Sequence, residues 1–388
     1  MKNGYMAMVL LMVGSLLPIK AVVAGDPLSI RAIAPMQQPR AVHQVVALDA
    51  NEVLVIGGCG GESCSPVQSS AEVFDVAQQR FTMTTSMQTP RVSHAAAVLA
   101  NGDVLVVGGW TGEAATATAE RFDRATRTFQ TLESMATPRI DPIALTLDDG
   151  RVLIAGGATA IGAAVASVEL FEPSSRRFVP IPPMREPRTH HVGARLPDGR
   201  ILITGGLRAR DAPLASAEIF DPRSGRFSAT GAMAGARYKH AMVTLADGRI
   251  LVMGGSSGGD DRNRLASTEI YDANTHTFAP GPSLLEPRFK IPSSAGVLRS
   301  GDVIIAGGAA DVEMWRPGAP SFARVDGTLG TAYEFSSATV LNNDQLLVLG
   351  GYDTHIRPTA QAWLVGPLRA APEVARGFAN EVLTGAAP

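Results

Sequence analysis

Four segments of the chain share one order of hydrophobic and polar positions. Each begins with a methionine and a short polar turn, runs through apolar residues to a turn that contains glycine, and ends in a second apolar run and a diglycine. These segments are 86–109, 135–157, 184–206 and 233–255. Internal repetition of this kind is typical of proteins that stack one supersecondary unit many times.

The segment 86–132 predicts four strands. We expect an innermost strand at Ser93–Leu99, a tight Asn-Gly turn at 101–102, and a buried strand at Val104–Val107, which is continuous in apolar residues. A third strand is expected at Ala119–Phe122 and a fourth around 128–132. The diglycine after the second strand supplies backbone conformations that other residues adopt rarely.

Seven diglycines mark seven such units, and the spacing from one diglycine to the next is 43 to 53 positions. They lie at 57–58, 108–109, 156–157, 205–206, 254–255, 307–308 and 350–351. A period near 50 with four short strands per unit is in the range of kelch β-propeller repeats.

Two further motifs strengthen this resemblance to the kelch family, which covers about residues 28–366. A Glu-x-aromatic-Asp strand occurs at 71–75, 119–123, 217–221 and 268–272. An aromatic residue follows in the fourth strand, at Phe81, Phe129, Phe178, Phe227 and Phe278. The resemblance implies an all-β fold, a seven-bladed propeller of four-stranded antiparallel blades.

The two ends of the array predict how the ring closes. The seventh unit offers strands within Tyr333–Leu341, Gln345–Leu349 and Ala360–Leu364, but no fourth strand follows. We expect the N-terminal segment Leu28–Ile33 to complete this last blade and so to remove an exposed sheet edge. The expected organisation is a signal peptide at 1–24, a propeller at 25–366 and a tail at 367–388.

The first 24 residues have the features of a secretory signal peptide. Lys2 precedes an apolar run, and small residues lead to Ala24, after which cleavage is expected. The alternative is a membrane anchor, although the run looks short for the about 20 residues of a spanning helix. We therefore expect an exported protein, periplasmic or extracellular, without stable membrane insertion.

Composition and charge agree with a folded, exported protein. Hydrophobic residues make up 45% and charged residues 18% of the chain, which favours a globular fold over disorder. Cleavage would remove Lys2 and Lys20 and no acidic residue, so the formal charge of −2 would become −4. Because nucleic acid is bound mainly by basic residues, a weakly acidic protein is not expected to have a nucleic-acid partner. Cys59 and Cys64 are the only cysteines; a loop disulfide is expected, with free thiols or half a metal site as alternatives.

Charged residues recur at two positions of the repeat. An arginine ends the Met-x-x-Pro-Arg corner on the face of the ring that we call the top, at Arg40, Arg91, Arg139, Arg188, Arg237 and Arg288; a glutamate lies in the third strand, at Glu72, Glu120, Glu169, Glu218, Glu269 and Glu313. The seventh unit lacks both and has Tyr333 and Gln361 instead. This covariation predicts Arg–Glu pairs within blades, since a buried carboxylate needs a partner.

The residues two places after each corner differ from unit to unit, as expected of a site grafted on a repeated scaffold. They are Val42, Ser93, Asp141, His190, Lys239, Lys290 and Phe335. We expect them to share the strand face of the corner arginines, since side chains alternate along a strand. The lysines are the only two after residue 24, which predicts unpaired positive charge and an anion-favouring patch; two solvated lysines without a role are the alternative.

The ligand-binding residues expected on this top face are those of the third to seventh units. They are Arg188, Arg237, Arg288, Lys239, Lys290, His190, Asp141 and Tyr333. Four histidines lie three places after corners, at His43, His94, His191 and His240. Histidine is a common metal ligand, but we expect these to hydrogen-bond to the channel wall. The loop at 254–264, with Asp260 and Asp261, does not match a calcium loop, so no metal or cofactor is expected.

Three functions fit these features. The first is a monomeric binding module that holds a protein, peptide or carbohydrate, since the chain resembles kelch adaptors that bind peptides on the top face. The second is a sugar-acting enzyme, because exported kelch propellers include galactose oxidase and sialic-acid mutarotases; Tyr333 matches the oxidase pattern, but Glu334 stands where it has histidine. Glu334 and His190 are the catalytic candidates for a mutarotase-like reaction. The third is a structural surface protein.

Overall fold

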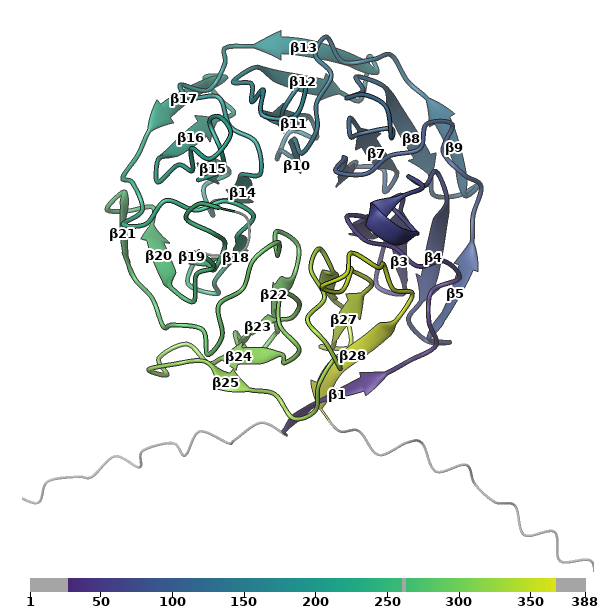
Figure 1. Ribbon diagram of the computed structural model, residues 1–388. Helices are drawn as coiled ribbons and strands as arrows, with labels where there is room; N and C mark the ends of the chain where they lie inside the picture. The colour runs from purple at the N-terminus through teal and green to yellow at the C-terminus, as the bar shows by residue number, and fades with distance from the viewer. Residues whose placement is uncertain (1–26, 260–262, 368–388) are drawn as a thin grey trace, which may run out of the picture.

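The computed structural model describes residues 27–259 and 263–367. Within these ranges the chain forms seven four-stranded antiparallel sheets, arranged as blades around a central axis (Figure 1). This confirms the predicted seven-bladed, all-β propeller. The expected signal peptide, Asp260, Asp261 and the tail beyond Pro367 lie outside the described residues.

In every blade the first strand lies next to the axis and the last lies at the rim (Figure 1). Blade one consists of β2 (Gln44–Ala47), β3 (Glu52–Ile56), β4 (Ala71–Asp75) and β5 (Arg80–Met83). Blade two consists of β6 (Ala95–Val98), β7 (Val104–Val107), β8 (Ala119–Asp123) and β9 (Thr128–Thr131). Blade three consists of β10 (Ile143–Thr146), β11 (Val152–Ala155), β12 (Val168–Glu172) and β13 (Arg177–Ile181). Blade four consists of β14 (Val192–Arg195), β15 (Ile201–Thr204), β16 (Ala217–Asp221) and β17 (Arg226–Ala229).

The remaining blades follow the same order, with one irregular member. Blade five consists of β18 (Ala241–Thr244), β19 (Ile250–Met253), β20 (Thr268–Asp272) and β21 (Thr277–Pro280). Blade six consists of β22 (Ala295–Val297), β23 (Val303–Ile305), β24 (Glu313–Trp315) and β25 (Ala323–Arg324). Blade seven consists of β26 (Ser337–Val340), β27 (Leu346–Leu349), β28 (Ala362–Pro367) and the N-terminal β1 (Leu28–Ala32). The short 3-10 turn η1 (Glu62–Cys64) lies between β3 and β4.

The N-terminal strand closes the ring as predicted. β1 pairs antiparallel with β28, in a register that places Leu28 opposite Pro367 and Ala32 opposite Trp363. Blade seven therefore joins the two ends of the propeller in one sheet, and β28 does not present a free edge.

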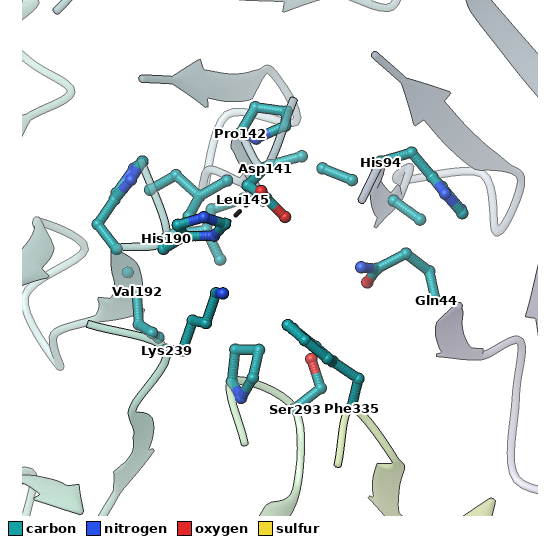
Figure 2. A pocket seen from close by; sticks show the side chains of 17 residues that line it. Gln44, His94, Asp141, Pro142, Leu145, His190, Val192, Lys239, Ser293 and Phe335 are labelled. Carbon is teal, nitrogen blue, oxygen red and sulfur yellow. Dashed lines mark ion pairs between the residues drawn. The ribbon is translucent and has the colours of Figure 1, made fainter. Parts of the chain in front are cut away.

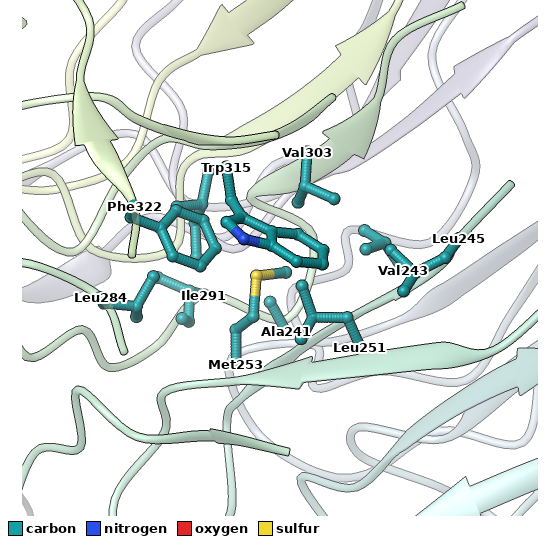
Figure 3. Packing of buried hydrophobic residues seen from close by; sticks show 11 residues of the cluster. Ala241, Val243, Leu245, Leu251, Met253, Leu284, Ile291, Val303, Trp315 and Phe322 are labelled. Atoms are coloured by element: carbon teal, nitrogen blue, oxygen red, sulfur yellow. The ribbon is translucent and has the colours of Figure 1, made fainter. Parts of the chain in front are cut away.

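Hydrophobic contacts between neighbouring blades form the core. Each of the seven blade–blade interfaces has its own cluster of buried side chains. Between blades five and six, Met253 and Leu251 pack against Trp315 and Val303 (Figure 3). The second strand of a blade is buried on both faces, as in β7, where all four residues are 0% exposed. This explains the continuous apolar runs of the sequence.

The aromatic residues of the third and fourth strands pack against each other within a blade. The rings of Phe122 and Phe129 lie 5.0 Å apart, and those of Phe171 and Phe178 lie at the same distance. Such pairs contribute about 0.5–1.5 kcal/mol beyond the burial of their area. This contact accounts for the recurring aromatic positions of the repeat.

The diglycine is required by a close approach between neighbouring blades. In blade two, Gly108 and Gly109 have φ values of +66° and +103°, which side chains other than glycine adopt rarely. A Cβ atom on Gly108 would lie 2.6 Å from the carbonyl oxygen of Arg139 in blade three. The carbonyl of Arg139 instead accepts a hydrogen bond of 2.7 Å from the amide of Gly109.

Candidate functional site

The six corner arginines are buried inside their blades and paired with glutamate. The N–O distances are 2.8–3.0 Å in Arg40–Glu72, Arg91–Glu120, Arg139–Glu169, Arg188–Glu218, Arg237–Glu269 and Arg288–Glu313. All six arginines are at most 1% exposed. The pairs therefore form within blades, as the covariation in the sequence predicts.

Arg139 illustrates what each pair holds together. Its Nη1 donates to the carbonyl oxygens of Gly156, in the diglycine, and Ser167, before the third strand, at 2.8 and 2.7 Å. Glu169 also accepts backbone hydrogen bonds from Ala136 and Thr137 at 2.7 and 3.2 Å. The pair thus ties the incoming corner, the diglycine and the third strand of one blade.

This placement does not fit a ligand-binding role for Arg188, Arg237 and Arg288. Their guanidinium groups lie inside the blades, at hydrogen-bond distance from glutamate and from backbone carbonyls. A ligand on the top face does not reach them. Sequence reasoning assigned them to the site because their corners are next to it.

The residues two places after each corner form a ring around the channel mouth. We call these seven residues the mouth ring: Val42, Ser93, Asp141, His190, Lys239, Lys290 and Phe335, all with φ between 51° and 58°. Several are joined by backbone hydrogen bonds from one blade to the next, such as Asp141 N–H to Ser93 O at 2.8 Å and Lys239 N–H to His190 O at 3.0 Å.

The left-handed conformation corrects the expectation that these residues share a strand face with the corner arginines. The first strands begin after the mouth ring, for example at Ala95 in blade two and Val192 in blade four. Strand alternation therefore does not extend back to the corner. The corner arginines are buried inside the blades, whereas Asp141, His190, Lys239 and Phe335 of the mouth ring line the cavity at the channel mouth.

A cavity of about 190 Å³ opens at the mouth ring and extends down the first strands of blades two to four. Three of the expected binding residues, Asp141, His190 and Lys239, line it together. In Figure 2, Lys239 and Gln44 extend into the cavity from opposite sides, and Phe335 and Ser293 lie on a third side. The cavity thus combines charged, amide, hydroxyl and aromatic groups.

Asp141 and His190 form a pair across two adjacent blades. Nδ1 of His190 lies 3.0 Å from Oδ2 of Asp141, and both side chains are about one-fifth exposed. Burial alone would raise the pKa of Asp141, but the charge and hydrogen bond of His190, a hydrogen bond from Ser93 and the charge of Lys239 outweigh it, so the pKa is lowered. Asp141 is therefore a carboxylate at neutral pH.

The two lysines have different surroundings. The ammonium group of Lys239 lies 5.4–5.6 Å from the ring centres of Tyr238, Phe289 and Phe335, a distance typical of cation–π contacts. Lys290 forms an ion pair of 2.7 Å with Glu334. Lys290 also lies 5.4–5.5 Å from the ring centres of Phe289 and Tyr352. The expectation of unpaired positive charge is therefore wrong, and Lys290 does not line the cavity.

Glu334 and Tyr333, two of the residues singled out in the seventh unit, are used elsewhere. Glu334 is 8% exposed and accepts from both Lys290 and Arg264, so its carboxylate is held outside the cavity. The ring of Tyr333 packs 5.3 Å from that of Trp363 in β28. Neither residue lines the cavity.

The histidines after the corners are buried in the channel wall. His43 lies 2.8 Å from the hydroxyl of Ser337, and His240 lies 2.8 Å from that of Thr204, as expected of wall hydrogen bonds. The expectation fails for His94 and His191, because their ring nitrogens have no partner in hydrogen-bond geometry among the described residues. Burial, with help from a nearby arginine in each case, lowers the pKa of His43, His94 and His191 to about 3. Among the described residues, no three His, Cys, Asp or Glu side chains gather to hold a metal.

The disulfide Cys59–Cys64 is present, as predicted. It spans the loop after the first diglycine, on the same face as the mouth ring. Cys59 is buried in a small apolar cluster with Ala41, Val92 and Tyr352, against which Phe335 of the mouth ring packs. The disulfide therefore holds this loop next to the apolar residues at the channel mouth.

The loop that follows the diglycine on the top face is shortest in blade six. In six blades the residue after the corner forms a β-bridge to the residue after the diglycine, as Val92 does to Trp110. In these blades nine to twelve residues separate the diglycine from the third strand. Blade six has four, 309–312, and no such bridge is found there in the described chain.

Sequence reasoning missed some contributors to the cavity. Gln44 and Ser293 line it but stand at positions where the repeat gave no chemical signal. Phe335 was identified only as a member of the variable set. The useful signal was the variable set itself, because its members occupy one structural position in every blade.

Comparison with known proteins identifies the class. The Kelch motif family matches residues 91–136 and 237–285, which correspond to most of blade two and most of blade five. No curated protein matches the chain. Together with the seven four-stranded blades, these matches fit a kelch-repeat β-propeller. Propellers of this family are a common protein-binding module.

In the described ranges, no helix is long and apolar enough to cross a bilayer.

Proposed function

We propose that the protein is an exported binding module that holds a protein, peptide or carbohydrate ligand over the channel mouth. The observation that carries this proposal is the mouth ring. Six residue types occupy its seven positions, whereas the corner, the Arg–Glu pair and the diglycine around it repeat. Repetition serves the scaffold, and the position that varies is where a specific ligand would be recognised.

The dimensions of the cavity limit what enters it. Pockets for drug-sized ligands measure about 300–1,000 Å³, and this cavity of about 190 Å³ is smaller. It accepts a single unit, such as one sugar ring or one side chain. The rest of a larger ligand would lie on the top face.

Export rests on two features. Residues 1–24 have the pattern of a signal peptide. The disulfide Cys59–Cys64 is of the kind that persists in oxidising compartments. A periplasmic or extracellular location agrees with both.

A second candidate is a sugar-acting enzyme, favoured by the Asp141–His190 pair. A carboxylate that orients an imidazole through Nδ1 is a common arrangement for a general base. Asp141 replaces Glu334 as the acidic partner, because Glu334 is held by Lys290 and Arg264. This candidate predicts that a bound sugar is converted, which ligand-detected NMR would record.

A thermal-shift screen with neutral and acidic sugars and with neutral and acidic peptides tests the proposal. A ligand that binds the folded state raises the melting temperature by mass action. The two lysines provide a matched pair of variants: Lys239→Met should abolish the ligand-induced shift, and Lys290→Met, outside the cavity, should retain it. If no ligand shifts the wild-type protein, or if both variants retain the shift, the mouth is not the binding site and a structural role is favoured.

A further inference from the structure

The top loops of blades two and three consist almost entirely of apolar and small residues. These loops follow the diglycines and comprise residues 110–118 and 158–167. Glu113 is the only charged residue in either loop. In the blade-three loop, Ile161 is 86% exposed, the largest value for a large hydrophobic residue in the described chain. Exposed apolar side chains that gather on one face of a protein often mark an interaction site.

Trp110 connects this apolar surface to the channel mouth. It is only partly buried and packs against the cluster that contains Cys59 and Val92. Val67 of the blade-one loop packs against the same cluster, and a Cβ atom on Gly112 would lie 3.7 Å from Val67 Cγ2, so the loops of blades one and two touch. Phe335, which lines the cavity, packs there as well. The apolar surface of the loops therefore continues to the cavity.

The charges that a ligand can reach on this part of the top face are negative. In the corners and top loops of blades one to three, at 36–42, 59–70, 87–93, 110–118, 135–141 and 158–167, the acidic residues are Glu62, Glu113 and Asp141. The basic residues in these segments are the three corner arginines, which are buried and paired with glutamate. Asp141 is held by His190 in the cavity, whereas Glu62 and Glu113 are exposed on the loops.

Basic side chains of the adjoining blades do not reverse this charge. Arg357 of blade seven interacts with Glu62, but it is itself paired with Asp353 at 2.7 Å. In blade four, Arg208 lies 3.8 Å from Glu186. The top loop of that blade carries both signs, at Arg208, Arg210 and Asp211. The surface is therefore negative on the side of blades one and two and mixed on the side of blade four.

We propose that the top loops of blades two and three dock a short peptide segment of another protein, in which apolar side chains stand next to lysine or arginine. This inference rests on the proposed function, and it narrows the ligand to a basic, apolar peptide. The apolar side chains cover Trp110 and Ile161, and the basic ones lie beside Glu113 and Glu62. Tryptophan is enriched among the residues that dominate protein–protein binding, and complementary charges provide specificity.

Other occupants match this surface less well. Membranes with anionic lipids attract basic segments of proteins, so Glu62 and Glu113 would oppose docking to them. Small-molecule and sugar sites use several precisely placed polar groups. Besides Glu113 and the indole of Trp110, the polar side chains of the two loops are hydroxyls of threonine and serine. A second copy of this chain is the remaining occupant, and the experiment distinguishes it.

Three capped hexapeptides separate the effect of charge from that of apolar side chains: Gly-Lys-Leu-Leu-Lys-Gly, Gly-Glu-Leu-Leu-Glu-Gly and Gly-Lys-Ser-Ser-Lys-Gly. Binding to the full-length protein would be measured by ligand-detected NMR at low ionic strength, where exposed charges are screened least. We expect the lysine–leucine peptide to bind about tenfold more tightly than either of the others. It should also shift the fluorescence of Trp110, since Trp315 and Trp363 are only 4% and 5% exposed.

Three variants test the two parts of the surface. Ile161→Ser should weaken binding of the lysine–leucine peptide about fivefold. Leu285→Ser, at a 48% exposed residue in the corner of blade six, should not change it. Glu113→Lys should weaken the lysine–leucine peptide and strengthen the glutamate–leucine peptide. This gain of affinity is an outcome that a misfolded variant would not produce.

The inference is overturned if the lysine–leucine peptide does not bind, if the three peptides bind equally, or if Glu113→Lys leaves the preference unchanged. Self-association of the wild-type protein in sedimentation, lost in Ile161→Ser, would assign the surface to a second copy instead. If any of these occurs while a ligand from the thermal-shift screen still binds and is lost in Lys239→Met, the proposed function stands and only the peptide surface is rejected. If no ligand of either set binds, both are rejected.

Discussion

At the scale of the residue, one repeated contact stabilises the scaffold, and one variable position is left for function. The corner arginine and its glutamate are removed from water in six blades, and each group also bonds to the backbone. Three residues further on, a histidine is buried in four blades. Between these fixed positions lies the mouth ring, whose residues share a left-handed backbone conformation and of which Asp141, His190, Lys239 and Phe335 line the cavity. Within four residues of each such blade, a buried structural arginine is thus followed by a variable residue of the mouth ring and then by a buried histidine.

The Arg–Glu pair predicts a large effect of one substitution. Arg139→Met should lower the free energy of unfolding by about 3–5 kcal/mol, because it leaves Glu169 as an unpaired, buried carboxylate. The control is Arg177→Met: this side chain is 70% exposed, and its ion pair with Glu133 is 3.8 Å long. Exposed pairs contribute little. Equal losses in the two variants, measured by urea denaturation, would contradict a stabilising role of the buried pair.

The buried histidines predict that acid destabilises the fold. In the unfolded chain a histidine takes up a proton below about pH 6.5, whereas folded His43, His94 and His191 stay neutral until about pH 3. The unfolded state therefore binds more protons in this window, and stability is lost as the pH falls through it. Each histidine should cost about 1–2 kcal/mol between pH 7 and pH 5.

Urea denaturation at pH 7 and pH 5 measures this loss. His94→Gln should show a smaller difference between the two pH values than the wild-type protein, whatever its absolute stability. An unchanged difference would mean that His94 is not held neutral in the folded state. His276→Gln is the matched control, because His276 lies at the turn between β20 and β21, outside the channel wall.

At the scale of the element, most of the fold could be predicted from the sequence. The strand predicted at Val104–Val107 is the observed β7, because four consecutive apolar residues fit only a strand buried on both faces. The innermost strand is shorter than predicted and begins at Ala95 instead of Ser93. A left-handed residue at Ser93 delays it, and nothing in the local pattern of hydrophobic residues reports a single positive φ.

The candidate site was less predictable than the fold. The variable set led to Asp141, His190 and Lys239, which the structure brings into one cavity. The pairing of Asp141 with His190, the ion pair between Lys290 and Glu334, and the contribution of Gln44 depend on how neighbouring blades meet. The two pairs join residues that are 44 and 49 positions apart, and the period of the repeat does not specify such contacts.

The closing strand predicts a difference between its two faces. Ile30 packs against the cluster between blades six and seven, whereas Arg31 is exposed and bonds to Gln79. Ile30→Asp should destabilise the propeller by about 1–3 kcal/mol, because it places a charge against apolar side chains. Arg31→Asp should change stability by about 0.5 kcal/mol or less. Similar effects in thermal unfolding would argue that β1 does not hold the ring closed.

At the scale of the whole molecule, the propeller separates stability from recognition. Its seven interfaces bury the hydrophobic residues between blades, and its ring closure joins both ends of the described chain in one sheet. The mouth then offers a position at which each blade contributes one side chain without changing the scaffold. The shortened loop of blade six and the disulfide of blade one are two features that the other blades do not repeat in the described chain.

The most direct test of this division is to remove the differences at the mouth and leave the repeat intact. In the triple variant Asp141→Ser/His190→Ser/Lys239→Ser, three members of the mouth ring become the residue that Ser93 already is at the equivalent position, with the same left-handed backbone. Calorimetric titration with a ligand found by the thermal-shift screen would be compared between this variant and the wild-type protein. We predict a melting temperature within about 5 °C of the wild type and no detectable binding. Binding of wild-type strength, or loss of the fold, would contradict the claim that the mouth ring carries recognition and the repeat carries stability.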